Sequence, residues 1–160
     1  MRAALAQQLS GIDSVELGEL PDPVPAPGQA LIRVHGAGVG LWDVGFLSGG
    51  FPGLTLPFVP GQEVAGVVEA AGAGAGVQPG ERVYAVLFPA GGGFAELALA
   101  SADRLAPMPG KANFVEAAGL VIGESSLIGA TVAGLRPHAR VLMVGGDERD
   151  VVDLLTALRA

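Results

Sequence analysis

A lone carboxylate within an apolar stretch is a candidate for acid–base chemistry in this sequence. Glu124 lies in the segment LVIGESSLIGA, next to Ser125 and Ser126. Carboxylic acids in apolar surroundings are used as proton donors and acceptors near neutral pH, because burial raises their pKa. We therefore predict Glu124 as a catalytic acid or base and Ser125 as a substrate-binding residue. The alternative is an exposed glutamate at a helix start, with the serines as caps.

Other proton-transfer groups are few. His35 in RVHGAG, the histidine of the strand-rich part, is interpreted as a core residue rather than a base, and His138 is expected to be exposed in a turn. Tyr84 is a possible proton donor, but its ordinary pKa is far above neutrality and strand packing is the alternative role. The sequence has no cysteine, so thiolate nucleophiles, disulfides and cysteine-ligated metal centres are excluded.

Charge and hydropathy exclude further classes of protein. The net charge is −7, Lys111 is the single lysine, and the basic residues form no cluster, so no nucleic-acid partner is expected. The N-terminal segment carries polar and acidic residues where a signal peptide needs an apolar core. No stretch reaches the apolar length of a membrane span. We expect a cytoplasmic protein without membrane contact.

The first two thirds of the chain, which carry His35 and Tyr84, are expected to form short strands. Glycine- and proline-rich segments such as PDPVPAPGQ, LSGGFPG and FPAGGG separate the apolar runs. The strands are expected at residues 15–20, 30–39, 63–71, 81–87 and 94–100. Closely spaced short strands favour a barrel or a sandwich.

The pattern changes after residue 110. Residues 115–135 have helical spacing of apolar residues, although glycines at four positions weaken the prediction. A strand is expected at 139–144 and an amphipathic helix at 149–159. We therefore divide the chain into a β-rich domain, 1–115, and a second part, 116–160.

Three long segments carry a resemblance to a known family: RVHGAGVGLWD, LPFVPGQEVAGVVEAAGAGAGVQPGERVYAV and GGGFAELALASADRLAPMPGKANFVEAAGL. They resemble the medium-chain dehydrogenase/reductase superfamily, in its zinc-free quinone oxidoreductase and enoyl reductase branch. The resemblance implies a mainly β fold with some α: a GroES-like, partly open β-barrel, then helices and one residual β–α unit. No complete Rossmann domain is expected.

The sequence differs from zinc-dependent members of the family at two positions that supply zinc ligands. Zinc-dependent members have a cysteine at the position of Gly40 and a histidine at that of Gln62. Glycine has no ligating side chain and an amide binds zinc poorly, so no metal is expected.

The family's substrate cleft is implied at one lip of the barrel. Trp42, Phe51, Gln62 and Phe88 are predicted to bind substrate, with the Gln62 amide donating to a carbonyl. For the three aromatic residues the alternative is ordinary core packing.

Two carboxylates of the same region, Asp43 and Glu63, are predicted as catalytic. The alternative for Asp43 is to fix its loop backbone. Glu63 alternatively pairs with a nearby backbone or basic group.

The last segment, VLMVGGDERDVVDLLTALRA, aligns with the first strand, phosphate loop and first helix of the family's nucleotide-binding domain. Asp147, Glu148 and Asp150 stand where a pyrophosphate would bind, and their charge would repel it. A dinucleotide also needs several parallel strands, and one is present. We therefore expect no cofactor, no cofactor-binding residues and a naturally short protein. The lone strand would be covered in a homodimer through residues 139–160.

The leading hypothesis is a cofactor-independent enzyme acting on a small molecule, such as a cyclase or isomerase of a polyketide-like or enone metabolite. The first alternative is a truncated or split NADPH-dependent quinone or enoyl oxidoreductase. The second is a non-catalytic binding or scaffold protein.

Overall fold

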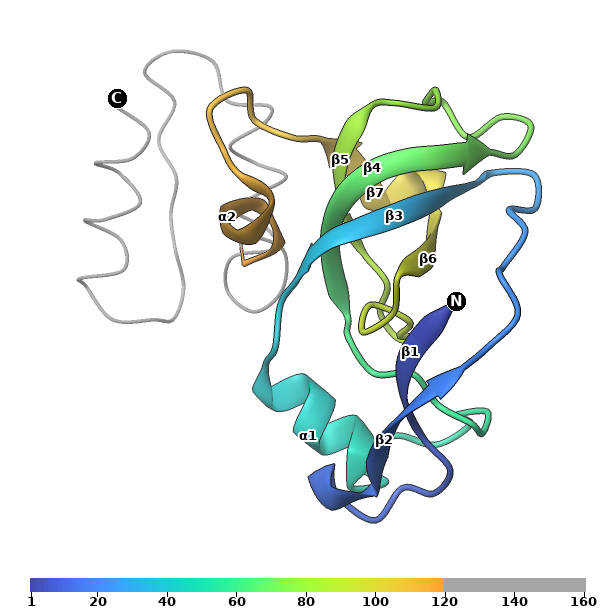
Figure 1. Cartoon of the computed structure of the whole chain (residues 1–160), viewed down its shortest axis with the longest axis vertical. Helices are drawn as coiled ribbons and strands as arrows, with labels where there is room; N and C mark the ends of the chain where they lie inside the picture. Colours follow the sequence, from blue (N-terminus) through green and yellow to red (C-terminus); the bar gives the residue numbers. More distant parts are fainter. Residues whose placement is uncertain (120–160) are drawn as a thin grey trace.

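The body of the protein is one curled antiparallel sheet (Figure 1). The structure is a computed structural model, and it describes residues 1–119. Its strands are β3 (Gln29–Ala37), β4 (Glu63–Ala71), β5 (Arg82–Val86), β6 (Leu97–Ser101) and β7 (Leu105–Pro107). They are ordered β6-β3-β4-β5-β7, so the edge strands β6 and β7 do not pair with each other. The predicted partly open, mainly β barrel is confirmed.

A second, two-stranded sheet of β1 (Arg2–Ala6) and β2 (Val15–Glu19) lies at the N-terminal side of the barrel. The Arg2 side chain and backbone bind the Glu96 carboxylate just before β6, with nitrogen–oxygen distances of 2.7 to 2.8 Å. These bonds to Arg2 lower the pKa of Glu96. The exposed charge pair adds to the backbone bonds Ala4 N–H to Phe94 carbonyl and Glu96 N–H to Arg2 carbonyl, which join the small sheet to the barrel.

Short helices complete the fold. They are the α-helices α1 (Leu41–Leu47) and α2 (Phe114–Ala118) and the 3-10 helices η1 (Ile12–Ser14) and η2 (Ala102–Arg104). None of the helices within residues 1–119 has the length and apolar character to cross a bilayer. The boundary predicted at residue 115 falls inside α2, and the division into two parts stays a prediction.

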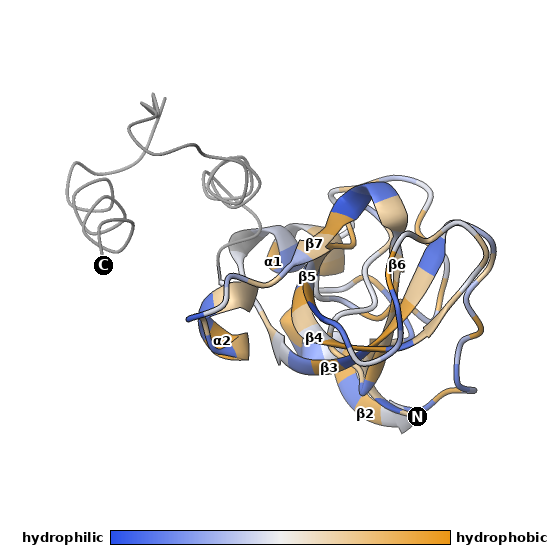
Figure 2. Ribbon diagram, turned by 90° about the horizontal axis from the view of Figure 1, so that it is seen from above, coloured by the Kyte–Doolittle hydropathy of each residue, from blue (hydrophilic) through white to orange (hydrophobic). Residues whose placement is uncertain are grey.

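Successive side chains along the strands point to opposite faces of the sheet, and this produces two apolar layers. Ile32, Val64 and Val83 are fully buried on the concave face of the sheet, where they form the barrel core. Ala65 and Tyr84 face the opposite side and are covered by α2. Figure 2 shows this interchange of apolar and polar residues along the strands.

Tyr84 is part of this outer layer, because it is buried with the residues that α2 contributes. Burial raises the pKa of its phenol, so the group stays protonated through the physiological range. Strand packing, the alternative interpretation of Tyr84, agrees with this position.

Four of the five expected strands agree closely with β2, β3, β4 and β5. The strand expected at 94–100 is β6, displaced toward Ser101. The Phe94 carbonyl and the Glu96 N–H bond to β1, whereas the Glu96 carbonyl accepts from Val34 N–H of β3. The strands β1 and β7 and the helix α1 were not predicted. Each is short, and α1 contains Gly45, which weakens a helical pattern.

Candidate functional site

The loop between β3 and α1 is fixed by Asp43. This residue is the third of α1, and its carboxylate accepts hydrogen bonds from the backbone N–H groups of Gly40 and Gly61, both at 2.9 Å. The first bond caps the helix and the second ties α1 to the segment before β4. The side chain is only 5% exposed. Both oxygens therefore have backbone donors, which is the structural role offered as the alternative to catalysis.

Three aromatic side chains meet beside α1, and we call Trp42, Phe51 and Phe88 the aromatic lip. Trp42 lies 6.0 Å from each of the other two ring centroids, and Phe51 and Phe88 are 6.1 Å apart, edge to face. The lip rests on the fully buried Phe46, which stacks on Phe51 at 4.0 Å. The structure thus brings these three predicted binding residues together.

Trp42 is the outer member of the lip and is 47% exposed. Ordinary core packing accounts for Phe46, but it does not account for a half-exposed indole ring with aromatic partners on two sides. Such a surface offers faces and edges to a flat unsaturated molecule.

Gln62 lies between the segments that carry Trp42 and Phe88. Its neighbour Gly61 donates to Asp43, and its own carbonyl accepts from Leu87 N–H at 2.7 Å. The residue is 2% exposed, yet neither Oε1 nor Nε2 of its side chain has a hydrogen-bond partner. An amide buried without a partner costs about 1–3 kcal/mol, so this position calls for an explanation.

Glu63 begins β4 and packs closely against the loop after β3. A Cβ added at Gly38 would lie 2.5 Å from the Glu63 carboxyl carbon, so a larger residue there would require the Glu63 side chain to move. Glu63 has an interaction partner of its own. Its predicted catalytic role stays a prediction.

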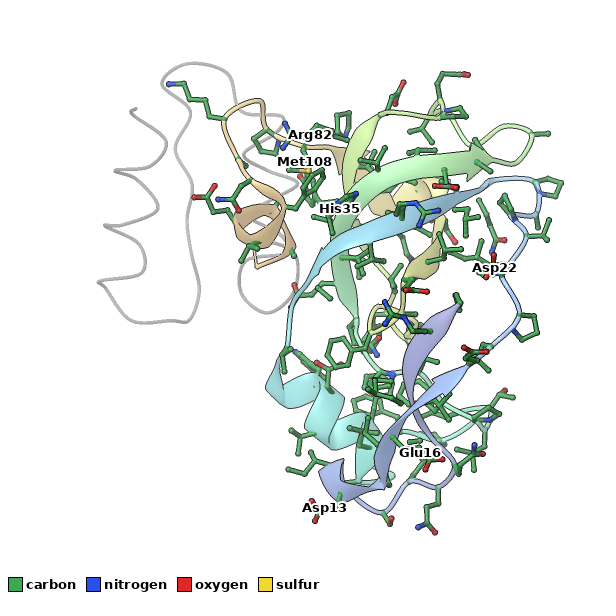
Figure 3. The ribbon with its side chains drawn as sticks, viewed as in Figure 1. Asp13, Glu16, Asp22, His35, Arg82 and Met108 are labelled. Atoms are coloured by element: carbon green, nitrogen blue, oxygen red, sulfur yellow. The ribbon has the colours of Figure 1, made fainter. Side chains whose placement is uncertain are left out.

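His35 lies away from the aromatic lip. Figure 3 shows it with Arg82 and Met108 on the side of the sheet that faces α2. Its ring stacks on Phe114 at 4.6 Å, and the Arg82 guanidinium lies 4.8 Å from the same Phe114 ring. This packing agrees with the interpretation of His35 as a structural residue.

The loop that carries Phe88 is held by a residue that sequence reasoning missed. Arg104, in η2, donates from Nη1 to the Phe88 carbonyl oxygen. Arg104, Phe88 and residues of β6 also line a cavity of about 580 Å³ at the unclosed side of the barrel. No sequence pattern predicts this contact, because it depends on how the sheet curls.

Several predicted residues lie outside the part of the chain that the structure describes. They are Glu124, Ser125, His138 and the proposed dimer segment 139–160, together with Asp147, Glu148 and Asp150. Their roles stay predictions.

Comparison with known proteins identifies the family. Residues 26–110 match the model of the alcohol dehydrogenase GroES-like domain, which is more than half of the chain. The quinone oxidoreductase of Mus musculus is 35% identical over 125 residues, which cover 76% of this chain and 38% of the mouse protein. The chain belongs to the medium-chain dehydrogenase/reductase superfamily.

Two further relatives agree with this assignment to the superfamily. A trans-enoyl reductase of Fusarium mangiferae is 37% identical over 105 residues, covering 65% of this chain and 27% of that enzyme. A probable oxidoreductase from Mycobacterium abscessus superposes with a TM-score of 0.72 at 31% identity, covering 88% of this chain and 45% of the other. This chain therefore spans less than half the length of each of these relatives.

The residues of this medium-chain dehydrogenase/reductase do not fit the zinc ion of other members. The two positions that supply ligands elsewhere hold Gly40, which has no side chain, and the amide of Gln62. Within residues 1–119 no three His, Cys, Asp or Glu side chains are grouped so that they could hold a metal ion. We derive no step through a metal.

Proposed function

We propose that this chain is the substrate-side domain of a quinone- or enone-reducing enzyme and that it binds a flat, unsaturated carbonyl compound at the aromatic lip. The observation that carries the proposal is the half-exposed Trp42, which contacts Phe51 and Phe88 above the buried Phe46. Two relatives with the names quinone oxidoreductase and trans-enoyl reductase support the proposal, being 35% and 37% identical to this chain over 125 and 105 residues.

Within this proposal the residues have separate tasks. The aromatic lip holds the plane of the substrate, and the Gln62 amide donates to its carbonyl oxygen. Asp43 keeps Trp42 in position by fixing the start of α1 to the segment before β4. In such a reductase the reducing equivalents come from a nicotinamide cofactor held by other residues. A cytoplasmic location belongs to the same proposal.

A second candidate is the cofactor-independent cyclase or isomerase. It is favoured by one observation, the acidic residues 147, 148 and 150 at the position of the phosphate loop. In that case the proton-transfer group is Glu124 or Glu63, because both carboxylate oxygens of Asp43 already accept backbone N–H groups. This second candidate includes the homodimer expected through residues 139–160, which would cover the lone strand.

Binding at the aromatic lip is tested directly by tryptophan fluorescence, since Trp42 is the one tryptophan of the sequence. We expect 1,4-naphthoquinone to quench this fluorescence in a saturable manner, and Phe51→Leu to weaken the affinity about tenfold by removing an aromatic contact. Leu17→Ala, at an exposed position on β2, is the matched control and should bind like the wild type. Quenching that rises linearly without saturation, in all three proteins, would mean that the lip is not a binding site.

The two candidate functions differ in their response to NADPH. A ligand that binds the native state raises its thermal stability by mass action. If residues of this chain take part in nucleotide binding, millimolar NADPH will raise the melting temperature, and the reductase is supported. No rise, combined with slow conversion of an enone probe that Glu124→Gln abolishes, would support the cofactor-independent enzyme.

A further inference from the structure

The cavity of about 580 Å³ at the unclosed side of the barrel lies between β6 and residues 87–92. A backbone hydrogen bond from Gly92 N–H to the Val59 carbonyl, at 2.8 Å, holds the wall that residues 87–92 form. Sites for small molecules are largely preformed clefts of about 300–1,000 Å³. The cavity fits this description in its size and in the fixed position of its wall.

Most of the described residues that line the cavity are apolar, and the polar ones lie together. The aliphatic residues of the lining include Val59, Leu87, Leu97 and Leu99. The polar residues lie where β6 ends: Ser101 is its last residue, Gln29 is the partner of Ser101 on β3, and Asp103 and Arg104 follow in η2. This distribution matches a ligand with an apolar body and a polar head.

Arg104 supplies a positive charge at the polar end. Its Nη1 donates to the carbonyl oxygen of Phe88, which also lines the cavity, so the guanidinium has a defined position. A guanidinium carries five N–H donors in one plane. Arg104 can therefore hold the Phe88 carbonyl and bind a carboxylate at the same time, because its planar fork fits the two carboxylate oxygens.

The other charges of the cavity favour an anion with a single charge. Asp103 also lines the cavity, and its carboxylate repels a doubly charged phosphate more than a monocarboxylate. Met1 is a further lining residue, but its ammonium is bonded to Asp22 at 2.8 Å and to the Leu20 carbonyl at 2.7 Å. Within the described lining, Arg104 is therefore the cation that a carboxylate would meet.

We propose that this cavity is a second binding site, which takes a monocarboxylic acid with an aliphatic chain and binds its carboxylate through Arg104. The chain of the ligand lies against the apolar lining, where its removal from water favours binding. Phe88 is shared with the aromatic lip, whereas Trp42 and Phe51 lie outside the described lining of the cavity. The inference goes beyond the proposed function and does not depend on it.

Isothermal titration calorimetry on the full chain tests this site with sodium octanoate and 1-octanol. The two probes have chains of the same length, and only octanoate has a carboxylate. Because Arg104 is exposed, its charge is partly screened, and we expect octanoate to bind about fivefold more tightly. Inorganic phosphate, an anion without a chain, should show no saturable binding at millimolar concentration.

Three variants assign the binding to Arg104 and to the cavity. Arg104→Gln removes the guanidinium, and we expect it to lower the affinity for octanoate about fivefold, to that for octanol. Arg33→Gln is the matched control, since it removes the same charge from an exposed pair with Glu69 outside the described lining, and it should bind octanoate like the wild type. Phe51→Leu, which alters the aromatic lip, should also leave octanoate binding unchanged.

Each contrary result overturns the proposal at a defined point. Equal affinities of the wild type for octanoate and octanol, or unchanged octanoate binding in Arg104→Gln, would remove Arg104 as the carboxylate-binding residue. Phosphate binding as tight as that of octanoate would rule out a ligand with an apolar body. Weaker octanoate binding in Phe51→Leu would place the ligand at the aromatic lip. If Arg104→Gln does not fold, the comparison of octanoate with octanol, on the wild type and on Phe51→Leu, still decides.

Discussion

Gly66→Ala is expected to lower the free energy of unfolding by about 3 kcal/mol or more, because β3 and β4 approach each other too closely for a side chain. Gly66 on β4, the central strand of the sheet, pairs with Val34 on β3. A Cβ at Gly66 would lie 2.8 Å from Cγ2 of Ile32 and 2.9 Å from the carbonyl carbon of Arg33, and it would also meet the Arg33 carbonyl oxygen. Most of this obstacle is backbone, so relief requires the strands to separate.

Urea unfolding followed by circular dichroism measures this loss. Gly110→Ala is the matched control, since a Cβ there meets nothing within 4 Å and the backbone is outside the left-handed region. The control should keep wild-type stability. If Gly66→Ala unfolds at the same urea concentration as Gly110→Ala, the close approach of β3 and β4 is not as described.

Asp43→Ala should also destabilise the protein, by about 3 kcal/mol. The substitution leaves the N–H groups of Gly40 and Gly61 without their acceptor, in a position that is 5% exposed in the wild type. Loss of a helix cap costs about 1 kcal/mol, and an orphaned buried donor costs a further 1–3 kcal/mol. The start of α1 should then separate from the segment before β4, and the affinity of the aromatic lip for naphthoquinone should fall with it.

The control for this prediction is Asp13→Ala. Asp13 is an exposed acid in the first turn of η1 without a side-chain capping bond, so its removal should change little. Thermal unfolding of both variants separates the loss of one carboxylate charge from the loss of two buried hydrogen bonds. Equal stability of the two variants would remove Asp43 as the residue that fixes the loop.

The parts of the site differed in how well they could be predicted. Trp42, Phe51 and Phe88 were assigned to one lip because they occupy cleft positions of a recognisable family pattern, and the structure brings their rings within about 6 Å of one another. Asp43 was assigned to catalysis, with loop fixation as the alternative. The sequence contains no indication that Gly61, eighteen residues away, would donate to it.

The state of Gln62 was likewise beyond sequence reasoning. Its type and its position in PGQE suggested a hydrogen bond to a substrate carbonyl. Whether a glutamine amide is solvated, paired or orphaned depends on the closure of surrounding segments, here those of Asp43 and Leu87. Arg104 was missed for the same reason, since its partner is a backbone carbonyl sixteen residues away.

Composition alone excluded several classes of site and partner, and local sequence pattern predicted the positions of four strands. Motif spacing indicated the family and, with it, the partly open barrel. These properties depend on turn residues and on alternation over a few neighbouring positions, which a chain displays without being folded. Only the tertiary structure decided which polar groups are satisfied: Asp43 by two backbone donors, Gln62 by none. Hydrogen-bond satisfaction is a property of segments that meet in space, and burial turns each unpaired group into a free-energy cost that a ligand can relieve.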